Sequence, residues 1–192
     1  MPTDPHLETD PYQRPTFTFA NRALRKLWHI VHFLLFRPTP VGFYPWRSFL
    51  LRVFGAKIGK ANHIYPSAKI WAPWLLETED IVTIGPGAEI YNPGGVYLAH
   101  HTIISQNAYV CTATHDYNKF TFDYITKPIL TEPYTWICAY AIVLPGVKFG
   151  EGSVLGAGAV ASRSLDPWTV HSGNPAREVK KRVPFDTNQP GK

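Results

Sequence analysis

The sequence predicts an all-β fold in which the chain winds into stacked triangular coils, and two spacing patterns support this prediction. Large apolar residues recur at every sixth position, at Ile137, Val143, Phe149 and Leu155, and the series continues with Ala161. A second series of smaller side chains runs four residues later, through Ala141, Val147, Ser153 and Ala159. A period of six fits neither a helix nor a simple strand. It is typical of a coil with three flat faces, in which one large and one small side chain per face fill a narrow interior.

The same period occupies the earlier part of the chain. It passes through Ile58, Ile64 and Ile70, then Ile84 and Ile90, and then Leu98, Ile104 and Val110. An irregular passage at 71–80 and a step of two residues past Val96 interrupt the series. We therefore expect coils of roughly 18 residues each over 56–166.

Two helical segments are expected before the coils, within residues 19–55. Residues 21–36 begin with basic side chains and are then apolar almost all round, and Arg37-Pro38 ends the pattern. Residues 43–54 combine aromatic residues with arginines and predict a second short helix. This apolar surface could pack on the coils or on a neighbouring subunit, or residues 21–54 could contact the inner face of a membrane. Residues 1–18, polar and proline-bearing, are expected to form a flexible arm.

The coil pattern is interrupted once and closed once. Residues 116–135 contain no clean hexad and many aromatic residues, which predicts a long loop extruded from the body. Residues 167–192 include the motif GNPAR followed by basic residues, and we expect them to form a cap and a tail. A cap is needed because the last coil of a stack exposes unpaired backbone and apolar side chains.

Composition limits the class of protein. A chain of 192 residues with 45% hydrophobic content is long enough for one domain with a packed core. The net charge of +5 would suit nucleic acid, a membrane surface or a phosphorylated ligand, but no nucleic-acid-binding motif accompanies it, so no nucleic-acid partner is expected. Cys111 and Cys138 form neither a CxxC motif nor a secreted disulfide framework, and the acidic N-terminus does not resemble a signal peptide. These features predict a cytoplasmic protein, with a peripheral position at the inner membrane face as an extension of that prediction.

His115 is the candidate general base, because it follows a short polar stretch just before the predicted loop leaves the body. A neutral imidazole can accept a proton near neutral pH. Asp116 could orient the ring, although adjacent side chains often diverge, so its role is secondary. Asn92, in the turn YNPGG, could lie on the same edge in the coil below, but Asn-Pro-Gly-Gly is also ordinary turn chemistry.

Two further groups of polar residues could form binding sites. His100 and His101 could join His115 around a metal, but neighbouring side chains on a flat coil are expected to point in opposite directions, so we predict no metal site. Basic residues near the C-terminus would suit a phosphate-rich ligand or form a solvated tail. They are Arg163, Arg177, Lys180, Lys181 and Arg182.

The ordered set of motifs resembles the hexapeptide-repeat O-acetyltransferases. It comprises the hexads, THDY before the loop, KPI inside it, Trp136, PGVKFGEGSVLGAGAV, and GNPAR followed by KKR. Over roughly residues 40–183 the chain is most similar to the colanic-acid-biosynthesis branch, which is related to the galactoside and maltose acetyltransferases, through LLRVFGAKIGK and ISQNAYVCTATHDY. The resemblance implies a left-handed parallel β-helix, assembled as a homotrimer with each active site between two subunits.

The resemblance also implies a mechanism. The histidine that matches His115 removes a proton from the acceptor hydroxyl, which attacks the acetyl-CoA thioester directly. A backbone N–H, here that of Ala139, meets the oxyanion. Trp136 would form an apolar wall, and Asn92 would hold the acceptor sugar. The sequence departs from the family at Cys138, where glycine is usual.

By the same resemblance, acetyl-CoA would lie along the last coils. Its pantetheine would pass Ala157 and Ser162, and its phosphates would lie near Arg163, Arg177 and Lys180. No metal is required. The aromatic residues of the loop could stack on an acceptor sugar or could only anchor the loop. They are Tyr117, Phe120, Phe122 and Tyr124.

The function implied is therefore acetyl-CoA-dependent O-acetylation of a sugar hydroxyl in exopolysaccharide synthesis. Two alternatives from other classes stay open at this point. One is a metal-dependent lyase of the carbonic anhydrase type on the same fold. The other is a non-catalytic trimeric scaffold at a membrane or a synthase complex.

Overall fold

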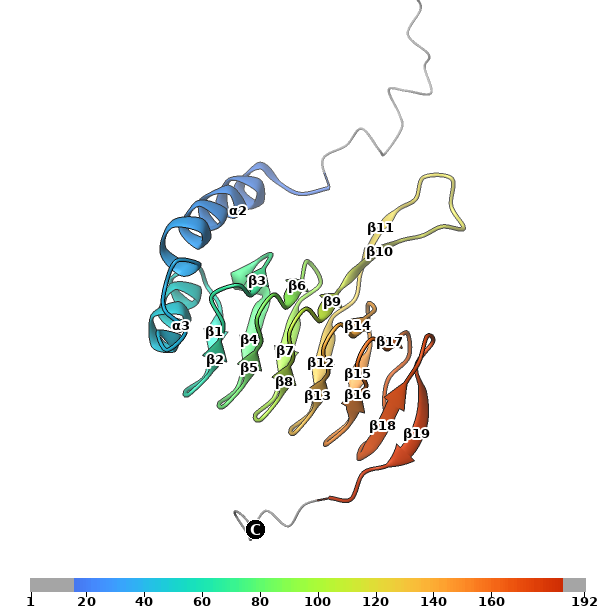
Figure 1. The fold of residues 1–192 in the computed structure, drawn as a ribbon. Helices are drawn as coiled ribbons and strands as arrows, with labels where there is room; N and C mark the ends of the chain where they lie inside the picture. The colour runs from blue at the N-terminus through green and yellow to red at the C-terminus, as the bar shows by residue number, and fades with distance from the viewer. Residues whose placement is uncertain (1–15, 185–192) are drawn as a thin grey trace, which may run out of the picture.

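The computed structural model describes residues 16–184, which form a three-sided parallel β-helix with helices at one end and a β-hairpin at the other (Figure 1). The predicted all-β coiled fold is confirmed. Most of the arm predicted at 1–18, and the end of the tail from residue 185 onward, lie outside the described residues.

Each coil contributes one short strand to each of three parallel sheets, here called faces A, B and C. Face A contains β1 (Lys57–Ile58), β4 (Leu76–Thr78), β7 (Val96–Leu98), β12 (Ile129–Thr131) and β15 (Lys148–Phe149). Face B contains β2 (His63–Ile64), β5 (Thr83–Ile84), β8 (Ile103–Ile104), β13 (Trp136–Ile137), β16 (Val154–Leu155) and β18 (Thr169–Ser172), with β19 (Arg177–Lys181) antiparallel at its end. Face C contains β3 (Lys69–Ile70), β6 (Glu89–Tyr91), β9 (Tyr109–Cys111), β14 (Ile142–Val143) and β17 (Val160–Ala161).

The two spacing series form the core. Every large residue of the predicted hexads is buried, from Ile58 in the first coil to Leu155 and Ala161 in the last. The smaller series is buried as well, at Ala141, Val147, Ser153 and Ala159. The large side chains lie on strands and the small ones at the corners, because a corner turns too sharply toward the axis to leave room for a bulky group. The six-residue period therefore predicted the core residue by residue.

Coil length changes along the stack. Before residue 113, where a second hairpin leaves the coil, the coils are longer than the expected 18 residues, since Lys57 pairs with Glu77, 20 residues later. In the first coil the added length includes the short 3₁₀ turn η3 (Pro73–Leu75), between faces C and A. After the hairpin the coils shorten, and Trp136 pairs with Val154. The edge between faces C and A, which we call the C/A edge, is therefore where additional residues are inserted.

The predicted loop at 116–135 needs correction. The chain leaves the coil as an antiparallel hairpin of β10 (Ala113–His115) and β11 (Tyr124–Thr126). It is back in the coil at β12, which pairs with β7 and buries Ile129 and Thr131. The coil therefore resumes well before Trp136. No apolar hexad residue marks this, because the inward position six residues before Ile137 is the buried Thr131.

Two helices precede the coils, as the sequence predicted, and they close the first coil. Helix α2 (Phe19–Val31) starts at Thr18, whose side chain accepts a hydrogen bond from the Asn21 N–H, and continues as the π-helical turn η2 (His32–Phe36). Helix α3 (Tyr44–Val53) follows. Trp28 is fully buried, and its indole N–H donates to the Ile70 carbonyl at 2.7 Å, which joins α2 to face C.

Arg47 is the polar counterpart of Trp28 in α3. Its guanidinium is fully buried and donates to the Ile64 carbonyl, to the Thr39 hydroxyl, and to the carbonyls of Pro40 and Val41. Burial lowers the pKa of Arg47, and the carbonyl acceptors replace the water that the buried cation loses. The helices are therefore fixed to the coil by an aromatic and a cationic anchor.

We predict that Trp28→Ala lowers the free energy of unfolding by about 3 to 5 kcal/mol, since it removes a buried indole and leaves the Ile70 carbonyl unpaired. Leu27→Ala, one position along the same helix on a half-exposed site, should cost less than about 1 kcal/mol. Denaturant unfolding of both variants measures this difference. Equal destabilisation by the two changes would show that α2 is not anchored through Trp28.

Candidate active site

The hairpin presents His115 at the C/A edge. In the ladder of β10 and β11, His115 lies opposite Tyr124, and the two rings contact edge to face with centroids 5.4 Å apart. The hairpin projects away from the body of the coil (Figure 1), and the imidazole is exposed to solvent. This placement agrees with the prediction that a histidine at the start of the interruption leaves the coil.

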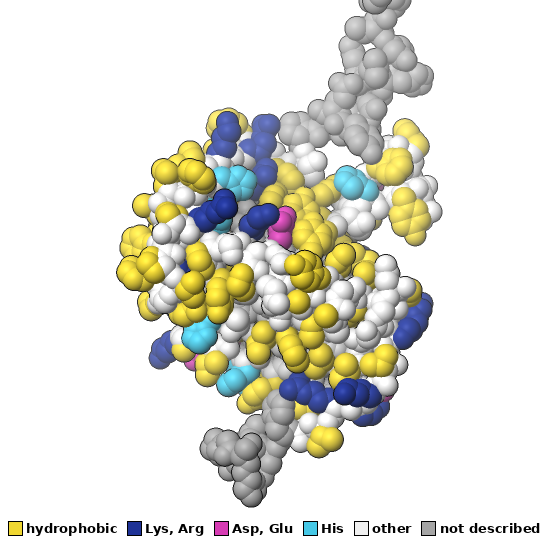
Figure 2. Space-filling model, viewed as in Figure 1, with side chains coloured by type: hydrophobic (Ala, Val, Ile, Leu, Met, Phe, Trp, Pro, Cys, Tyr) yellow, Lys and Arg dark blue, Asp and Glu magenta, His cyan; other side chains and the backbone are white. Residues whose placement is uncertain are grey.

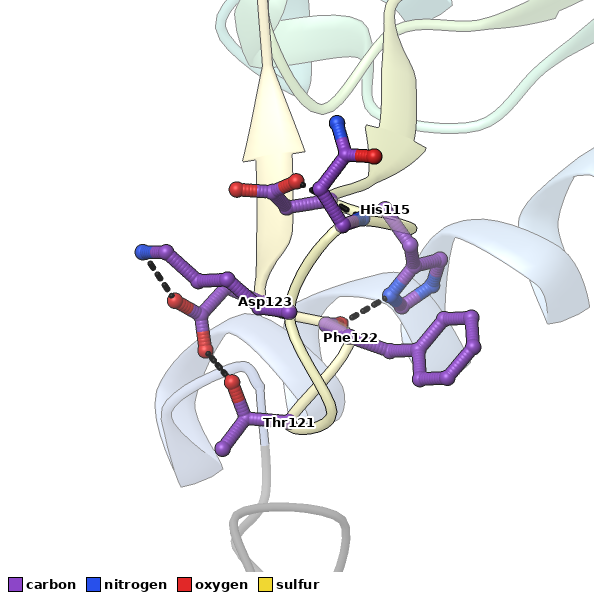
Figure 3. Close-up of polar contacts among 7 residues, drawn as sticks. His115, Thr121, Phe122 and Asp123 are labelled. Carbon is purple, nitrogen blue, oxygen red and sulfur yellow. Dashed lines mark hydrogen bonds and ion pairs between the residues drawn. The ribbon is translucent and has the colours of Figure 1, made fainter.

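One hydrogen bond fixes the His115 ring. Its Nδ1 lies 2.6 Å from the carbonyl oxygen of Phe122 (Figure 3). A carbonyl only accepts, so Nδ1 carries the hydrogen and donates. In the neutral ring Nε2 then has a free lone pair, which can accept a proton from a hydroxyl group.

The turn that holds the Phe122 carbonyl is tied by Asp123. The Asp123 carboxylate accepts from the Lys119 ammonium at 2.8 Å and from the Thr121 hydroxyl at 2.7 Å (Figure 3). The hydrogen bond from Lys119 is the larger of the effects that hold the pKa of Asp123 below its usual value. Both partners are exposed, so the ion pair itself adds little stability. Its contribution is to the shape of the turn.

Asp116 does not have the predicted orienting role. Its carboxylate accepts from the Asn118 N–H at 3.1 Å and so closes the start of the turn. The acceptor for His115 is a backbone carbonyl seven residues away. A carbonyl has no side-chain signature, so the sequence could not identify it.

Asn92 lies on the predicted edge, but its predicted contact with an acceptor is wrong. The adjacent turn is tied to the base of the hairpin, because the Gly94 N–H donates to the Thr112 hydroxyl at 2.8 Å. The Asn92 side chain itself is fully buried. Its amide donates to the Ala72 carbonyl and accepts from the Ala72 N–H, at 2.9 and 3.0 Å. Both ends of the amide are therefore used to join two coils.

A row of aromatic side chains connects the hairpin with α2. Of its members, the sequence predicted a role only for Tyr124. We call Trp71, Tyr91 and Tyr124 the aromatic row. Tyr91 contacts Trp71 with ring centroids 5.3 Å apart, and its hydroxyl lies 3.1 Å from that of Tyr124. Arg25 of α2 stacks over the Trp71 ring at 4.4 Å. Burial, followed by the hydrogen bond with Tyr91, raises the pKa of Tyr124, so its hydroxyl stays protonated.

A second candidate region lies at the B/C edge, between faces B and C. Ala139 and Ala157 occupy equivalent turn positions in neighbouring coils, and the Ala139 carbonyl accepts from the Gly158 N–H at 3.0 Å. Within residues 16–184, neither the Ala139 N–H nor the Ala157 N–H has a hydrogen-bond acceptor. Two backbone donors one coil apart are therefore available to a ligand along this edge. Burial raises the pKa of the neighbouring Cys138, which favours the thiol over the nucleophilic thiolate.

The other predicted binding residues are distributed over the last coils. Trp136 begins β13 on face B, donates its indole N–H to the Ser105 hydroxyl at 2.9 Å and is 44% exposed. Ser162 and Arg163 are exposed just after β17 at the C/A edge. Arg177 and Lys180 are exposed on β19, and Arg177 pairs with Ser172 near the B/C edge. His115 and Ala139 therefore lie at different edges of the same chain.

Two members of the basic group have local partners. Lys181 forms an ion pair with Glu178 at 3.0 Å. Arg182 donates to the carbonyls of Tyr134 and Gly152, at 3.2 and 2.9 Å, and so holds the cap against the corner between faces A and B. Burial lowers the pKa of Arg182. Arg182 thus acts as a structural cation, whereas Arg163, Arg177 and Lys180 extend from the surface.

The expectation that His100 and His101 point in opposite directions is wrong. Their Nδ1 atoms are 3.0 Å apart, and the His101 ring stacks on Tyr134. His101 has a φ of 58°, which turns its side chain back toward its neighbour. Within residues 16–184, no group of three or more histidine, cysteine, aspartate or glutamate side chains is arranged to hold a metal ion.

Known proteins similar to this chain include a curated acetyltransferase. No protein-family model matches the chain. The chain is 38% identical over 167 residues to WcaF of Escherichia coli strain K12, whose name assigns it to acetyl transfer in colanic acid biosynthesis, and the match covers 87% of this chain and 92% of WcaF.

Solved structures share the fold. A maltose O-acetyltransferase from Clostridium difficile 630 superposes with a TM-score of 0.78 at 20% identity, over 87% of this chain and 90% of its own. A hexapeptide-repeat acetyltransferase from Vibrio cholerae O1 biovar eltor, solved with acetyl coenzyme A, superposes with a TM-score of 0.77 at 21% identity, over 93% of this chain and 99% of its own.

The hydrogen bond to Phe122 predicts the tautomer of His115. Nitrogen NMR of the neutral ring should show the hydrogen on Nδ1, the reverse of the preference of free histidine. Asp123→Ala should shift the ring toward the Nε2–H form, because it releases the turn that holds the carbonyl. A ring with Nε2–H in the unmodified protein would contradict the assignment.

Proposed function

The chain belongs to the hexapeptide-repeat acetyltransferases, in the branch represented by WcaF, and we propose that it transfers the acetyl group of acetyl-CoA to a sugar hydroxyl of a cell-surface polysaccharide precursor. The observation that supports this reaction best is the orientation of the exposed His115 ring. Its Nδ1–H donates a hydrogen bond to the Phe122 carbonyl, which leaves Nε2 to act as the base. The name of WcaF supports a polysaccharide precursor as acceptor. Two free cysteines, Cys111 and Cys138, fit a reducing cytoplasm.

His115 acts as a general base in a direct transfer. Nε2 removes the proton from the acceptor hydroxyl as its oxygen bonds to the thioester carbon. The carbonyl oxygen becomes an oxyanion, which the Ala139 N–H stabilises. Collapse of this tetrahedral intermediate breaks the carbon–sulfur bond and forms the acetylated sugar. The CoA thiolate takes the proton from Nε2 and leaves as the free thiol. No acyl-enzyme and no metal take part, and Cys138 remains a buried thiol.

The two groups meet across a subunit boundary. Within one chain, His115 lies at the C/A edge and Ala139 at the B/C edge, so the width of face C separates them. Six residues of extended chain span about 15 to 20 Å, too far for both groups to contact one reacting carbonyl. In a cyclic homotrimer, the hairpin of one subunit can lie against the B/C edge of the next. The tip residues Tyr117 and Phe120 are almost fully exposed in the single chain, which fits this contact.

The substrates take opposite ends of this site. The acceptor sugar lies on the aromatic row beside His115, where the face of Trp71 or Tyr91 can pack against a sugar ring. Acetyl-CoA lies along the last coils, with the N–H groups of Ala139 and Ala157 directed to its pantetheine. Its phosphates are bound by exposed polar and basic side chains of the last coils. These are Ser162, Arg163, Arg177 and Lys180.

His115→Ala should reduce kcat for acetyl transfer by about 10² to 10⁴, because it removes the base, while CoA binding stays unchanged. The assay follows release of free CoA thiol with candidate acceptor sugars. His29→Ala, a change at an exposed histidine on α2, is the matched control and should retain activity. A loss of less than about tenfold in an intact His115→Ala trimer would exclude His115 as the base.

Ala139→Pro tests the oxyanion donor. The Ala141 N–H donates to the Cys138 carbonyl, and Tyr140 has a φ of 59°, so Ala139 takes the first central position of a turn that favours proline. Pro86 and Pro145 already occupy that position in other coils. The change therefore keeps the turn and removes only the N–H.

We expect Ala139→Pro to lower kcat by about 10² to 10³, the usual effect of losing one oxyanion donor. Ala139→Ser keeps the N–H and should stay within a few-fold of the unmodified enzyme. Equal activities of the proline and serine variants would assign the oxyanion to another donor.

A further inference from the structure

Helix α2 and its continuation η2 together have three sides with different chemistry. One side packs on the coil through Trp28 and through His32, whose Nε2 lies 2.9 Å from the Ala68 carbonyl. A second side is exposed and basic, with Arg22 and Lys26 one turn apart. The third side is exposed and apolar. Its row is Leu24, Leu27, Ile30 and Leu34, at the spacing of one helical stripe.

Helix α3 continues the apolar surface. Arg47, Leu50 and Leu51 face the body, and the opposite side presents the row Phe43, Trp46, Phe49 and Val53. The Trp46 indole N–H donates to the Leu35 carbonyl of η2 at 2.9 Å, which brings the two rows together. Figure 2 shows hydrophobic side chains gathered over α2 and α3 at the left of the molecule. We call this surface the helical base.

The charge around the helical base is predominantly positive. Between Pro11 and Leu76 the sequence has no aspartate or glutamate, and it contains ten lysines and arginines. The exposed cations Arg22 and Lys26 of α2, together with Arg37 just after η2, flank the apolar row. Glu89, which pairs with Lys69 beside the hollow lined by His29 and Arg37, is the acid near this border. An apolar surface that is bordered mainly by cations complements a layer of apolar chains beneath anionic headgroups.

We propose that the helical base binds the surface of a bilayer that contains anionic lipid. Leu27, Ile30 and Leu34 are 51, 55 and 58% exposed, so burial among acyl chains removes apolar area from water. Trp46 and Phe49 are residue types favoured at the interfacial depth. A second copy of this surface is a poorer partner, because two predominantly cationic rims would face each other and repel. Within residues 16–184, no helix is long and apolar enough to cross the bilayer, so the contact is peripheral.

Docking by the helical base also brings the acceptor end of the site near the membrane. Phe17, just before α2, contacts Tyr124 of the hairpin with ring centroids 5.5 Å apart, and Arg25 of α2 stacks on Trp71. The aromatic row therefore begins at the N-terminal end of α2. This step rests on the proposed function, and it favours a glycan attached to a membrane lipid as the acceptor.

Vesicle co-sedimentation tests the surface without an activity assay. The full-length protein should bind vesicles of phosphatidylcholine with phosphatidylglycerol, and bind vesicles of phosphatidylcholine alone much more weakly. Ile30→Ser/Leu34→Ser should weaken binding by roughly tenfold or more, because two partly exposed side chains no longer enter the acyl region. Arg22→Glu/Lys26→Glu should remove most of the preference for anionic lipid, and added salt should have the same effect. Val179→Ser/Val183→Ser alters two exposed valines on the opposite end of the molecule and should bind as the unmodified protein does.

Three results would overturn the proposal. The unmodified protein could fail to bind vesicles of either composition. The Ile30→Ser/Leu34→Ser and Val179→Ser/Val183→Ser variants could also bind anionic vesicles equally well. In the third result, light scattering would show that the Ile30→Ser/Leu34→Ser variant dissociates, and the unmodified protein would not bind vesicles. These two observations together would assign the helical base to a contact between subunits. Thiol release with a soluble acceptor, measured on the same samples, distinguishes failure of membrane binding from failure of the enzymatic function.

Discussion

The narrow interior of the coil is the constraint on which the rest of the structure depends. Parallel strands of neighbouring coils lie about 4.8 Å apart, so each coil must supply a large side chain to every face and a small one to every corner. Ile137, Ala141 and Val143 show the pattern in its simplest form, and all three are fully buried. Inward positions cannot vary much in size. Chemistry is therefore confined to corners, where residues can be added and backbone groups can face outward.

The two ends of the proposed site use corners in different ways. At the C/A edge an insertion creates a hairpin, and a backbone carbonyl of its turn sets the tautomer of His115. At the B/C edge nothing is inserted, and the regular turn leaves the N–H groups of Ala139 and Ala157 without partners inside residues 16–184. In the proposed mechanism, one edge supplies a base on a projecting arm, and the other supplies fixed dipoles on a rigid wall. In the proposed trimer, these two kinds of edge meet.

The sequence predicted whatever depends on the side-chain period and missed what depends on coil length or on backbone groups. The hexads identified the core and the placement of His115. The assumed coil of 18 residues hid the aromatic row, because Trp71 and Tyr91 come into register only in coils of 20 residues, as the pairing of Lys69 with Glu89 shows. The carbonyl of Phe122 carries no sequence signal. Asn92 was placed on the correct edge, but only the structure shows that its amide is consumed by the Ala72 backbone. The helices were predicted from their apolar content, while the separation of α2 into three sides required knowledge of which side packs on the coil.

The central claim is that each active site takes His115 from one subunit and Ala139 from its neighbour. Mixed trimers assembled from His115→Ala and Ala139→Pro subunits test it most directly. Each variant is impaired alone, but random mixing gives about a quarter of the sites an intact histidine from one subunit and an intact amide from the next. We predict that the mixture recovers about a quarter of the activity of the unmodified enzyme. Activity no higher than that of the separate variants would contradict the account and place both groups in one chain.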